Sequence, residues 1–229
     1  MQLYKIRGGD KESLEAKKYD ICVGISLGNK WFSPENIVGL IEWSLVHTKE
    51  FVVVCPADDI HAINVQARTG RSRESSLRVA KRMSDELMSL VKVQADSRFT
   101  DTEKERIIYA TWSDVVSEEY QKKVEFLYGE YKNNHDFRLA IQNIIRSHIS
   151  KESRTFSDEA VNMLGMYILE ELPEVAGRVP VKGITYEAYV YPHDGTLTEF
   201  IEQIQKRKIF PEIGKVIVGD EPKVFLEVR

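Results

Sequence analysis

Short apolar runs alternate with longer amphipathic stretches along the chain, which predicts alternating strands and helices. Residues 19–27 and 51–56 are apolar and rich in β-branched side chains, as expected of strands buried on both faces of a parallel sheet. Between them, Ser33 and Pro34 supply a cap and a first-turn proline, and residues 34–47 are predicted to form a helix. A strand, a helix and a parallel strand make one βαβ unit, which we expect to be right-handed.

The remaining sequence continues this alternation. Helices are predicted over residues 72–95, 102–131, 134–150, 157–172 and 196–208, a strand over 183–191, and a terminal strand pair over 215–228 around a turn at 219–222. There is no internal repeat and no linker rich in Pro, Gly or Ser. We therefore expect one α/β domain over residues 1–229, with a Rossmann-like, mostly parallel central sheet flanked by helices.

Composition narrows the class of protein. The 229 residues are 42% hydrophobic and 30% charged, which excludes a disordered chain, and the net charge of -4 excludes an evenly basic one. No apolar stretch approaches 18 residues and the N-terminus has no apolar signal core, so we expect a cytoplasmic protein that does not bind a membrane. Cys22 and Cys55 lie in apolar runs without paired histidines, which indicates buried thiols and no metal site.

A serine between two glycines follows the first predicted strand. Gly24, Ser26 and Gly28 lie where open parallel sheets place their ligands, and the glycines permit a tight turn and close approach of a substrate. The pattern also matches the G-x-S-x-G nucleophile elbow of α/β-hydrolases. Only 23 residues precede Gly24, however, whereas the hydrolase fold needs earlier strands before its serine.

A phenol and a carboxylate share one face of a late helix. Tyr167 and Glu171 are four residues apart, so their side chains are neighbours, whereas Glu170 points elsewhere. Such a pair can hold an ammonium group or transfer protons.

A basic stretch lies within this acidic protein. Residues 66–92 contain seven basic and three acidic residues. At about 100° per residue, Arg71, Arg78 and Arg82 fall on one side of a helix. The opposite, apolar side is expected to comprise Ala80, Met83, Leu87, Leu90 and Val91. A row of guanidinium groups suits phosphates, which favours binding of a nucleic acid.

Taken together, these features resemble the cyclodipeptide synthases, which join two aminoacyl groups, delivered as aminoacyl-tRNAs, into a diketopiperazine. The resemblance rests on Gly24-Ile25-Ser26, on the segment from Tyr167 through Glu171 to Pro173, and on Tyr191-Pro192, and it covers essentially the whole chain. It implies a fold similar to the catalytic domain of class I tyrosyl- and tryptophanyl-tRNA synthetases, without ATP or another cofactor. It also implies a monomer and the family's Tyr-Pro branch, although Asn29 is a feature of the other branch.

The resemblance implies roles for individual residues. Ser26 would attack the first ester to form an aminoacyl-enzyme, with backbone N–H groups around it stabilising the oxyanion. Tyr167 and Glu171 would hold the α-ammonium group, and Glu171 would transfer a proton when the second aminoacyl-tRNA reacts to give a dipeptidyl-enzyme. Tyr191 would relay a proton during ring closure. The tRNA would be contacted by Arg68, Arg71, Arg78, Lys81 and Arg82.

The resemblance also implies a pocket for the first aminoacyl side chain, with Cys22, Gly24, Val54 and Glu174 in its lining; Asn29 is placed among the substrate-binding positions as well. Glu174 stands out because this neighbourhood is often apolar in the family. If its carboxylate faces the pocket, a polar or cationic side chain such as histidine is favoured over leucine or phenylalanine; alternatively, it caps the helix end in solvent.

Two other functions fit parts of the sequence. A serine hydrolase would use Ser26 with His193 and an aspartate, and it would cleave esters without tRNA. A noncatalytic RNA-binding module would depend on the basic helix alone, so that changes at Ser26 and Tyr167 would have no consequence. Neither explains why Tyr167, Glu171 and Pro173 recur at the family's spacing.

Overall fold

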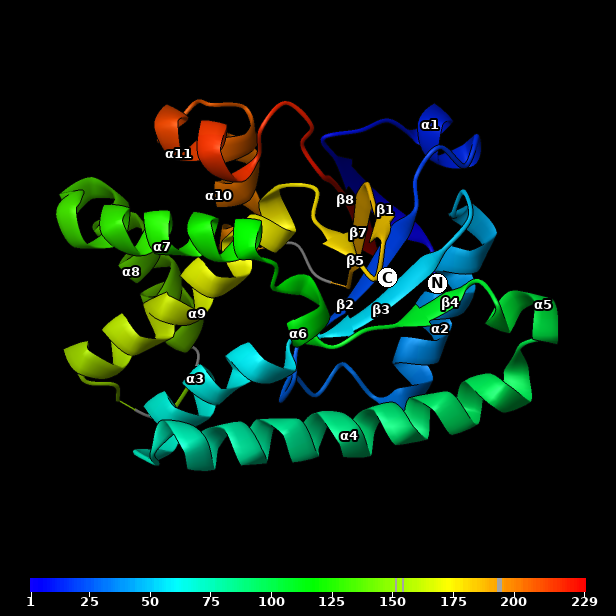
Figure 1. The fold of residues 1–229 in the computed structure, drawn as a ribbon, viewed down its shortest axis with the longest axis horizontal. Coiled ribbons are helices and arrows are strands. Elements are labelled where there is room, and N and C mark those ends of the chain that lie inside the picture. The colour runs from blue at the N-terminus through cyan, green and yellow to red at the C-terminus, as the bar shows by residue number, and fades with distance from the viewer. Residues whose placement is uncertain (151, 154, 193–194) are drawn as a thin grey trace.

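A six-stranded sheet forms the centre of the computed structural model, which describes residues 1–150, 152–153, 155–192 and 195–229 (Figure 1). Its strand order is β1-β8-β7-β2-β3-β4, and every neighbouring pair is parallel except β1 with β8. The strands are β1 (Leu3–Arg7), β2 (Ile21–Ile25), β3 (Val52–Pro56), β4 (Ile107–Tyr109), β7 (Ala188–Tyr191) and β8 (Val224–Val228). A separate hairpin pairs β5 (Pro180–Val181) with β6 (Ile184–Thr185). The expected mostly parallel sheet is confirmed.

Helices cover both faces of this sheet. They are α1 (Lys11–Glu15), α2 (Pro34–His47), α3 (Asp58–Thr69), α4 (Arg73–Arg98), α5 (Asp101–Lys104), α6 (Trp112–Val115), α7 (Glu118–Asn133), α8 (His135–Ile149), α9 (Asp158–Ala176), α10 (Thr196–Gln205) and α11 (Pro211–Ile217). One hydrophobic core joins a sheet face to α1, α2 and α4, and a second core joins the other face to α6 through α11. Helix α3 packs against both α4 and α9 (Figure 1).

Strands β2 and β3 are buried on both faces because their side chains alternate between the two cores. Cys22 of β2 and Val53 of β3 contribute to the core beside α9, whereas Val23 and Val54 contribute to the core beside α2 and α4. Continuous apolar runs are therefore needed, and the expected βαβ unit β2–α2–β3 is observed.

Two expected elements, the helix over 102–131 and the strand pair over 215–228, are wrong. Residues 102–131 do not form one helix but contain α5, β4, α6 and the start of α7. Residues 215–228 form the end of α11 and a single strand, β8, instead of two strands, because Ile213 and Ile217 bury one helical face after Pro211 at the first turn. Strand β1 and helix α3 are additional elements that the pattern did not predict.

Helix α4 faces the core through a row of mostly small residues. The buried positions are Ser76, Ala80, Ser84, Met88, Val91 and Ala95. Leu90, which was expected on the apolar side, is 56% exposed, whereas Met83 and Leu87 are partly buried. Small side chains in the first half of the row permit close packing of α4 on α3, and this contact sets the rotation of the helix.

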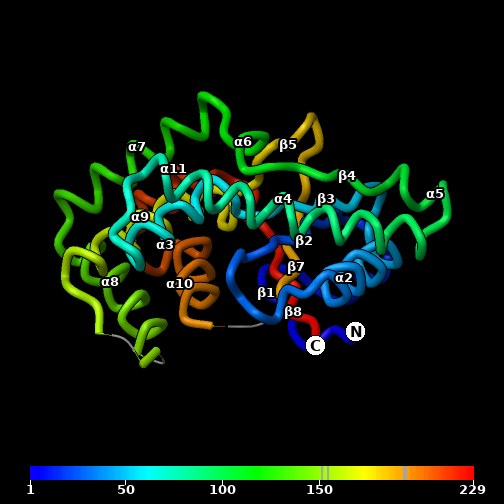
Figure 2. Tube along the Cα trace, turned by 90° about the horizontal axis from the view of Figure 1, so that it is seen from below, coloured from blue at the N-terminus to red at the C-terminus, as the bar shows by residue number. Residues whose placement is uncertain are grey.

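The first and last residues lie side by side at one edge of the sheet (Figure 2). Strand β1 pairs antiparallel with β8, and the N–H of Gln2 donates a hydrogen bond of 2.7 Å to the carbonyl oxygen of Arg229. Within the ranges that the structure describes, no helix combines the length and apolar character needed to cross a membrane.

Candidate active site

Two neighbouring strands bring the predicted serine and the later tyrosine to the same edge of the sheet. Ser26 directly follows β2, and Tyr191 is the last residue of β7, which pairs in parallel with β2. The chain order of the strands changes direction at β2, with β3 on one side and β7 on the other. Open parallel sheets bind ligands outside the carboxyl ends of their strands at such a switch point.

Helix α9 adds the phenol and the carboxylate of the second motif. Tyr167 Oη donates a hydrogen bond of 3.4 Å to Glu171 Oε1, one helical turn further along. Ser26 lies close enough to the phenols of Tyr167 and Tyr191 for its side chain to act on the pKa of both, in the lowering direction. Residues from β2, β7 and α9 therefore meet, and we call Ser26, Tyr167, Glu171 and Tyr191 the Ser26 cluster.

Burial controls the ionisation of this cluster. Burial, with a smaller effect of the nearby Glu174 carboxylate, raises the pKa of Glu171 to about 8. Burial also raises the pKa of Tyr191 to about 12 and that of Tyr167 well above its ordinary value. Both phenols are therefore hydrogen-bond donors at neutral pH, whereas Glu171 gains or loses a proton close to it.

A tight loop after Ser26 fixes the serine in place. Gly28 has a φ of 80°, which favours glycine, and a Cβ there would lie 3.4 Å from the His61 imidazole. Asn29 Oδ1 accepts a hydrogen bond of 3.0 Å from the Trp31 N–H, and the Asn29 side chain acts on the pKa of Tyr191 in the lowering direction. Asn29 of the serine loop is therefore near the end of β7.

His61 is a site residue that the sequence analysis missed. It lies in α3 and is buried beneath the Gly28 turn, and burial lowers its pKa to about 4, with a smaller contribution from Arg68. A signal was present: Asp58 and Asp59 follow a buried strand and precede apolar residues spaced three apart, Ile60 and Ile63.

The pairing of β2 with β3 places Val54 on the opposite sheet face from Cys22 and Gly24, with which it was expected to line the pocket for the first aminoacyl side chain. Gly24 pairs with Cys55 and faces the same core as Cys22, whereas Val54 faces the opposite core. Val54 therefore cannot line a pocket with Cys22 and Gly24, because successive strand residues point to opposite faces. Val53 and Cys55 are the β3 residues that lie on the same face as Cys22 and Gly24. Burial raises the pKa of both thiols well above the ordinary value, which keeps them protonated.

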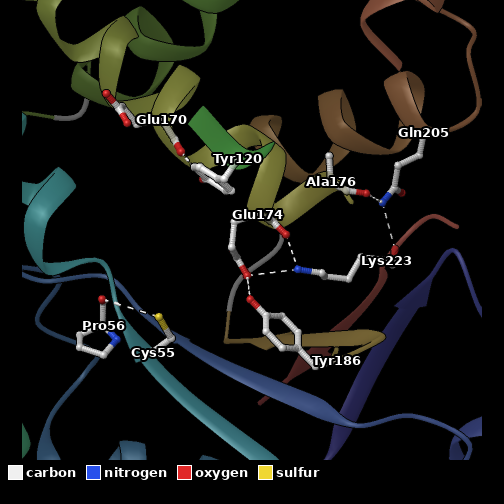
Figure 3. A network of polar contacts seen from close by, with 9 residues as sticks. All are labelled: Cys55, Pro56, Tyr120, Glu170, Glu174, Ala176, Tyr186, Gln205 and Lys223. Atoms are coloured by element: carbon white, nitrogen blue, oxygen red, sulfur yellow. Dashed lines mark hydrogen bonds and ion pairs between the residues drawn. The ribbon is translucent and has the colours of Figure 1, made fainter. Parts of the chain in front are cut away.

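Glu174 is buried, so the alternative that it caps the helix end in solvent is wrong. Its side chain is 2% exposed, and its Oε1 accepts hydrogen bonds from Tyr186 Oη and, at 3.2 Å, from Lys223 Nζ (Figure 3). Lys223 is fully buried and also donates to the main-chain oxygen of Glu174. A lysine 49 residues away therefore neutralises this carboxylate.

The residues expected to contact tRNA do not form a single row of unpaired basic side chains on one helix. Arg71 precedes Ser72, the N-cap of α4, and so lies outside the helix. Arg78 and Arg82 are 67% and 71% exposed but pair with Glu74 and Glu86, at 2.5 and 3.8 Å. Lys81 pairs with Asp59 of α3 at 3.3 Å. Exposed pairs of this kind contribute little free energy, so a phosphate can displace the carboxylates.

Arg68 differs from the other expected contacts. It lies on α3, and its guanidinium makes two hydrogen bonds to the Glu152 carboxylate, at 2.5 and 2.8 Å. The guanidinium also lies over the ring of Phe156. A bidentate, half-buried pair fixes the segment that precedes α9, which indicates a structural role.

Neither a hydrolase triad with His193 nor a metal site is seen among the described residues. His193, which the hydrolase alternative pairs with Ser26, lies outside the described residues. Among the residues with described positions, no group of three or more His, Cys, Asp and Glu side chains could hold a metal ion.

Solved structures of other proteins share the fold of this chain. A cyclodipeptide synthase from Bacillus thermoamylovorans superposes with a TM-score of 0.72 at 17% identity, covering 96% of this chain and 91% of its own. A Mycobacterium tuberculosis protein, whose structure relates cyclodipeptide synthetases to type I tRNA synthetases, gives 0.71 at 18% identity, with 96% and 90% covered. The synthase from Candidatus Glomeribacter gigasporarum, solved bound to Phe-tRNAPhe, gives 0.54 at 18% identity, with 92% and 88% covered.

These likenesses confirm the fold, including its relation to class I tRNA synthetases. A search of curated protein sequences finds no match. The family described as cyclodipeptide synthase matches residues 11–211, which is most of the chain. Members of this family are tRNA-dependent transferases of aminoacyl groups, and neither the hydrolase nor the noncatalytic RNA-binding alternative is supported. This protein belongs to the cyclodipeptide synthase family.

Proposed function

We propose that the chain forms a cyclodipeptide from two aminoacyl-tRNAs through acyl intermediates on Ser26. The supporting observation is that Ser26, Tyr167, Glu171 and Tyr191, from three separate elements, meet at the switch point of the sheet. In the first step Ser26 Oγ attacks the ester carbonyl of one aminoacyl-tRNA. The new ester on Ser26 replaces the ester to the ribose, and the ribose oxygen leaves with the proton. Because one ester replaces another, no nucleotide is needed.

Glu171 is suited to handle the proton of the α-amino group. Its pKa of about 8 lies near the 7.7–8.0 of an ordinary α-amino group, so a proton moves between the two with little cost. When the ammonium transfers a proton to Glu171, the amine becomes a nucleophile. Tyr167, which stays protonated, holds the carboxylate in place by donating to it.

Retention of the dipeptide on the enzyme determines which amine attacks. The amine of the Ser26-bound aminoacyl group attacks the ester of the second aminoacyl-tRNA, and the second tRNA leaves. Attack in the opposite sense would release the dipeptide on tRNA. The free amine then attacks the Ser26 ester, closing the six-membered ring and returning the proton to Ser26. Tyr191, whose phenol lies near Ser26, is the group we propose to relay this proton.

Helix α4 is the proposed tRNA contact. Its exposed Arg78, Lys81 and Arg82 offer phosphate ligands that carry no base specificity, and Arg71 lies just before the helix. The chain is further proposed to act as a monomer and to belong to the Tyr-Pro branch, which Tyr191-Pro192 favours. Asn29, a feature of the other branch, then serves to orient Tyr191.

The nucleophile is tested by Ser26→Ala, with Ser153→Ala, in an exposed position, as the matched control. Both variants are incubated with mixed aminoacyl-tRNAs, and both the intact protein mass and cyclodipeptides are measured. Ser26→Ala is expected to lose the acyl-enzyme and the product, while the control retains both. Full activity of Ser26→Ala would refute the mechanism.

A further inference from the structure

A buried carboxylate oxygen without a partner lies close to the Ser26 cluster. Glu174 is 2% exposed, and its Oε1 is occupied by Tyr186 and Lys223 (Figure 3). Its Oε2 is buried and accepts no hydrogen bond from any residue that the structure describes. Buried acceptors are almost always satisfied, so an unpartnered one calls for an explanation, and a bound group that donates to it would supply one.

The position of Glu174 connects it to the reacting groups. It follows Glu171 by three residues on α9, so the two side chains are neighbours on the helix. The two carboxylates are close enough for Glu174 to raise the pKa of Glu171, although burial has the larger effect. The Tyr189 phenol is near both carboxylates and lies over Gly24, two residues before Ser26. Tyr189 therefore adjoins Gly24 and also interacts electrostatically with both carboxylates.

Lys223 determines what kind of group can complete this site. Its ammonium is fully buried and contacts both the carboxylate and the main-chain oxygen of Glu174. The pair has no net charge, so an additional buried cation would remain uncompensated. A neutral N–H or O–H donor adds a hydrogen bond to Oε2 without adding charge. A purely apolar group would leave Oε2 unsatisfied.

We propose that Glu174 Oε2 accepts a hydrogen bond from the side chain of the first aminoacyl group, so that the enzyme selects an amino acid with a neutral N–H or O–H donor. This inference rests on the proposed function. It narrows the expectation drawn from the family resemblance, because Lys223 removes the advantage of a cationic side chain such as that of lysine or arginine.

The test identifies the aminoacyl group on Ser26 by intact mass, using purified aminoacyl-tRNAs offered singly. Tyrosyl- and phenylalanyl-tRNA form one informative pair, since the two side chains differ by a single hydroxyl. A site that hydrogen-bonds a substrate hydroxyl or N–H rejects the analogue lacking it strongly, so acyl-enzyme from donor side chains is expected to exceed that from apolar or cationic ones by at least about 100-fold. Preferential loading with leucine, phenylalanine, lysine or arginine would overturn the proposal.

A double variant, Glu174→Leu with Lys223→Met, removes the acceptor and its counter-charge together. It is expected to lower the preference for donor side chains at least about 10-fold, and an unchanged preference would contradict the proposal. The matched control removes an exposed ion pair, Glu42→Leu with Arg98→Met, whose closest contact is 2.6 Å. If the double variant fails to fold, the amino acids that the parent protein loads onto Ser26 still test the proposal. If no amino acid gives an acyl-enzyme or a cyclodipeptide, the result contradicts the proposed function itself. The proposed role of Glu174 in selecting the amino acid would then be contradicted as well.

Discussion

The phenol of Tyr189 occupies the space that a side chain at position 24 would fill. An ideal Cβ on Gly24 would overlap the Tyr189 ring and hydroxyl, and both residues lie on central, neighbouring strands. Glycine at this position is therefore required by packing on the sheet face that carries Cys22 and Tyr189.

Gly24→Ala is consequently expected to destabilise the protein. Overpacking of this kind costs about 1–3 kcal/mol, and the displaced Tyr189 ring should also reduce cyclodipeptide formation. Urea unfolding measures the loss, and Tyr189→Leu in the same chain should recover part of it. Gly129→Ala in α7, where a Cβ would meet no atom within 4 Å, is the matched control and should leave the protein as stable or more so. Equal stability of the Gly24→Ala variant and the parent would contradict the packing argument.

Glu171 makes stability fall as pH rises. Its pKa is about 8 when folded but near 4.5 when unfolded, so between these values the unfolded chain has released a proton that the folded chain retains. The free energy of unfolding from this group therefore decreases by about 1.4 kcal/mol per pH unit over that range. Glu171→Gln should remove this slope and be more stable than the parent at pH 8. Thermal melting of both proteins at pH 6.5 and 8 measures this pH dependence of stability. Equal changes in melting temperature for the two proteins would contradict the role given to Glu171.

His61 produces the opposite slope at lower pH. Its folded pKa is about 4 and its ordinary value 6.5, so below 6.5 the unfolded chain binds a proton before the folded chain does. Stability from this group is present above pH 6.5 and is lost as the pH falls toward 4. His61→Leu should flatten the profile between pH 4 and 6.5, whereas a mere packing defect would lower the free energy of unfolding equally at every pH. Chemical denaturation at three pH values distinguishes the two.

The basic residues of α4 should control the salt dependence of tRNA binding. Replacing Arg78 and Arg82 with alanine is expected to weaken binding and to reduce the slope of log K against log salt by between about one and two, since each lost phosphate contact removes part of the counterion release. Filter binding between 50 and 200 mM salt measures this slope. As the matched reverse change, alanine at Glu74 and Glu86 frees both guanidinium groups and should strengthen binding. Identical salt slopes for the arginine variant and the parent would refute the contact.

Local patterns predicted the elements that hold the reacting residues. The apolar runs of β2 and β3 and the capped start of α2 at Ser33 are visible in sequence because each depends on residues close together in the chain. The prediction of a strand pair over residues 215–228 was wrong for a physical reason. Valine and isoleucine favour strands, but the packing of Ile213 and Ile217 overrides that preference in α11.

Long-range partners could not be predicted. Nothing near Glu174 indicates that Lys223 neutralises it, and nothing near Leu90 indicates that contact with α3 rotates this side chain into solvent. The face on which Val54 lies depends on strand register, which a single apolar run does not specify because every position in it is apolar.

The position of β2 between β3 and β7 has a consequence for synthesis of the chain on the ribosome. The strand before Ser26 is translated early, but its partner β7 and the helix with Tyr167 and Glu171 emerge only after more than half of the protein has been made. A nascent chain therefore presents Ser26, the proposed nucleophile, before the groups proposed to act with it have been made. On the proposed mechanism, the chain becomes able to take an aminoacyl group from tRNA only late in its own translation.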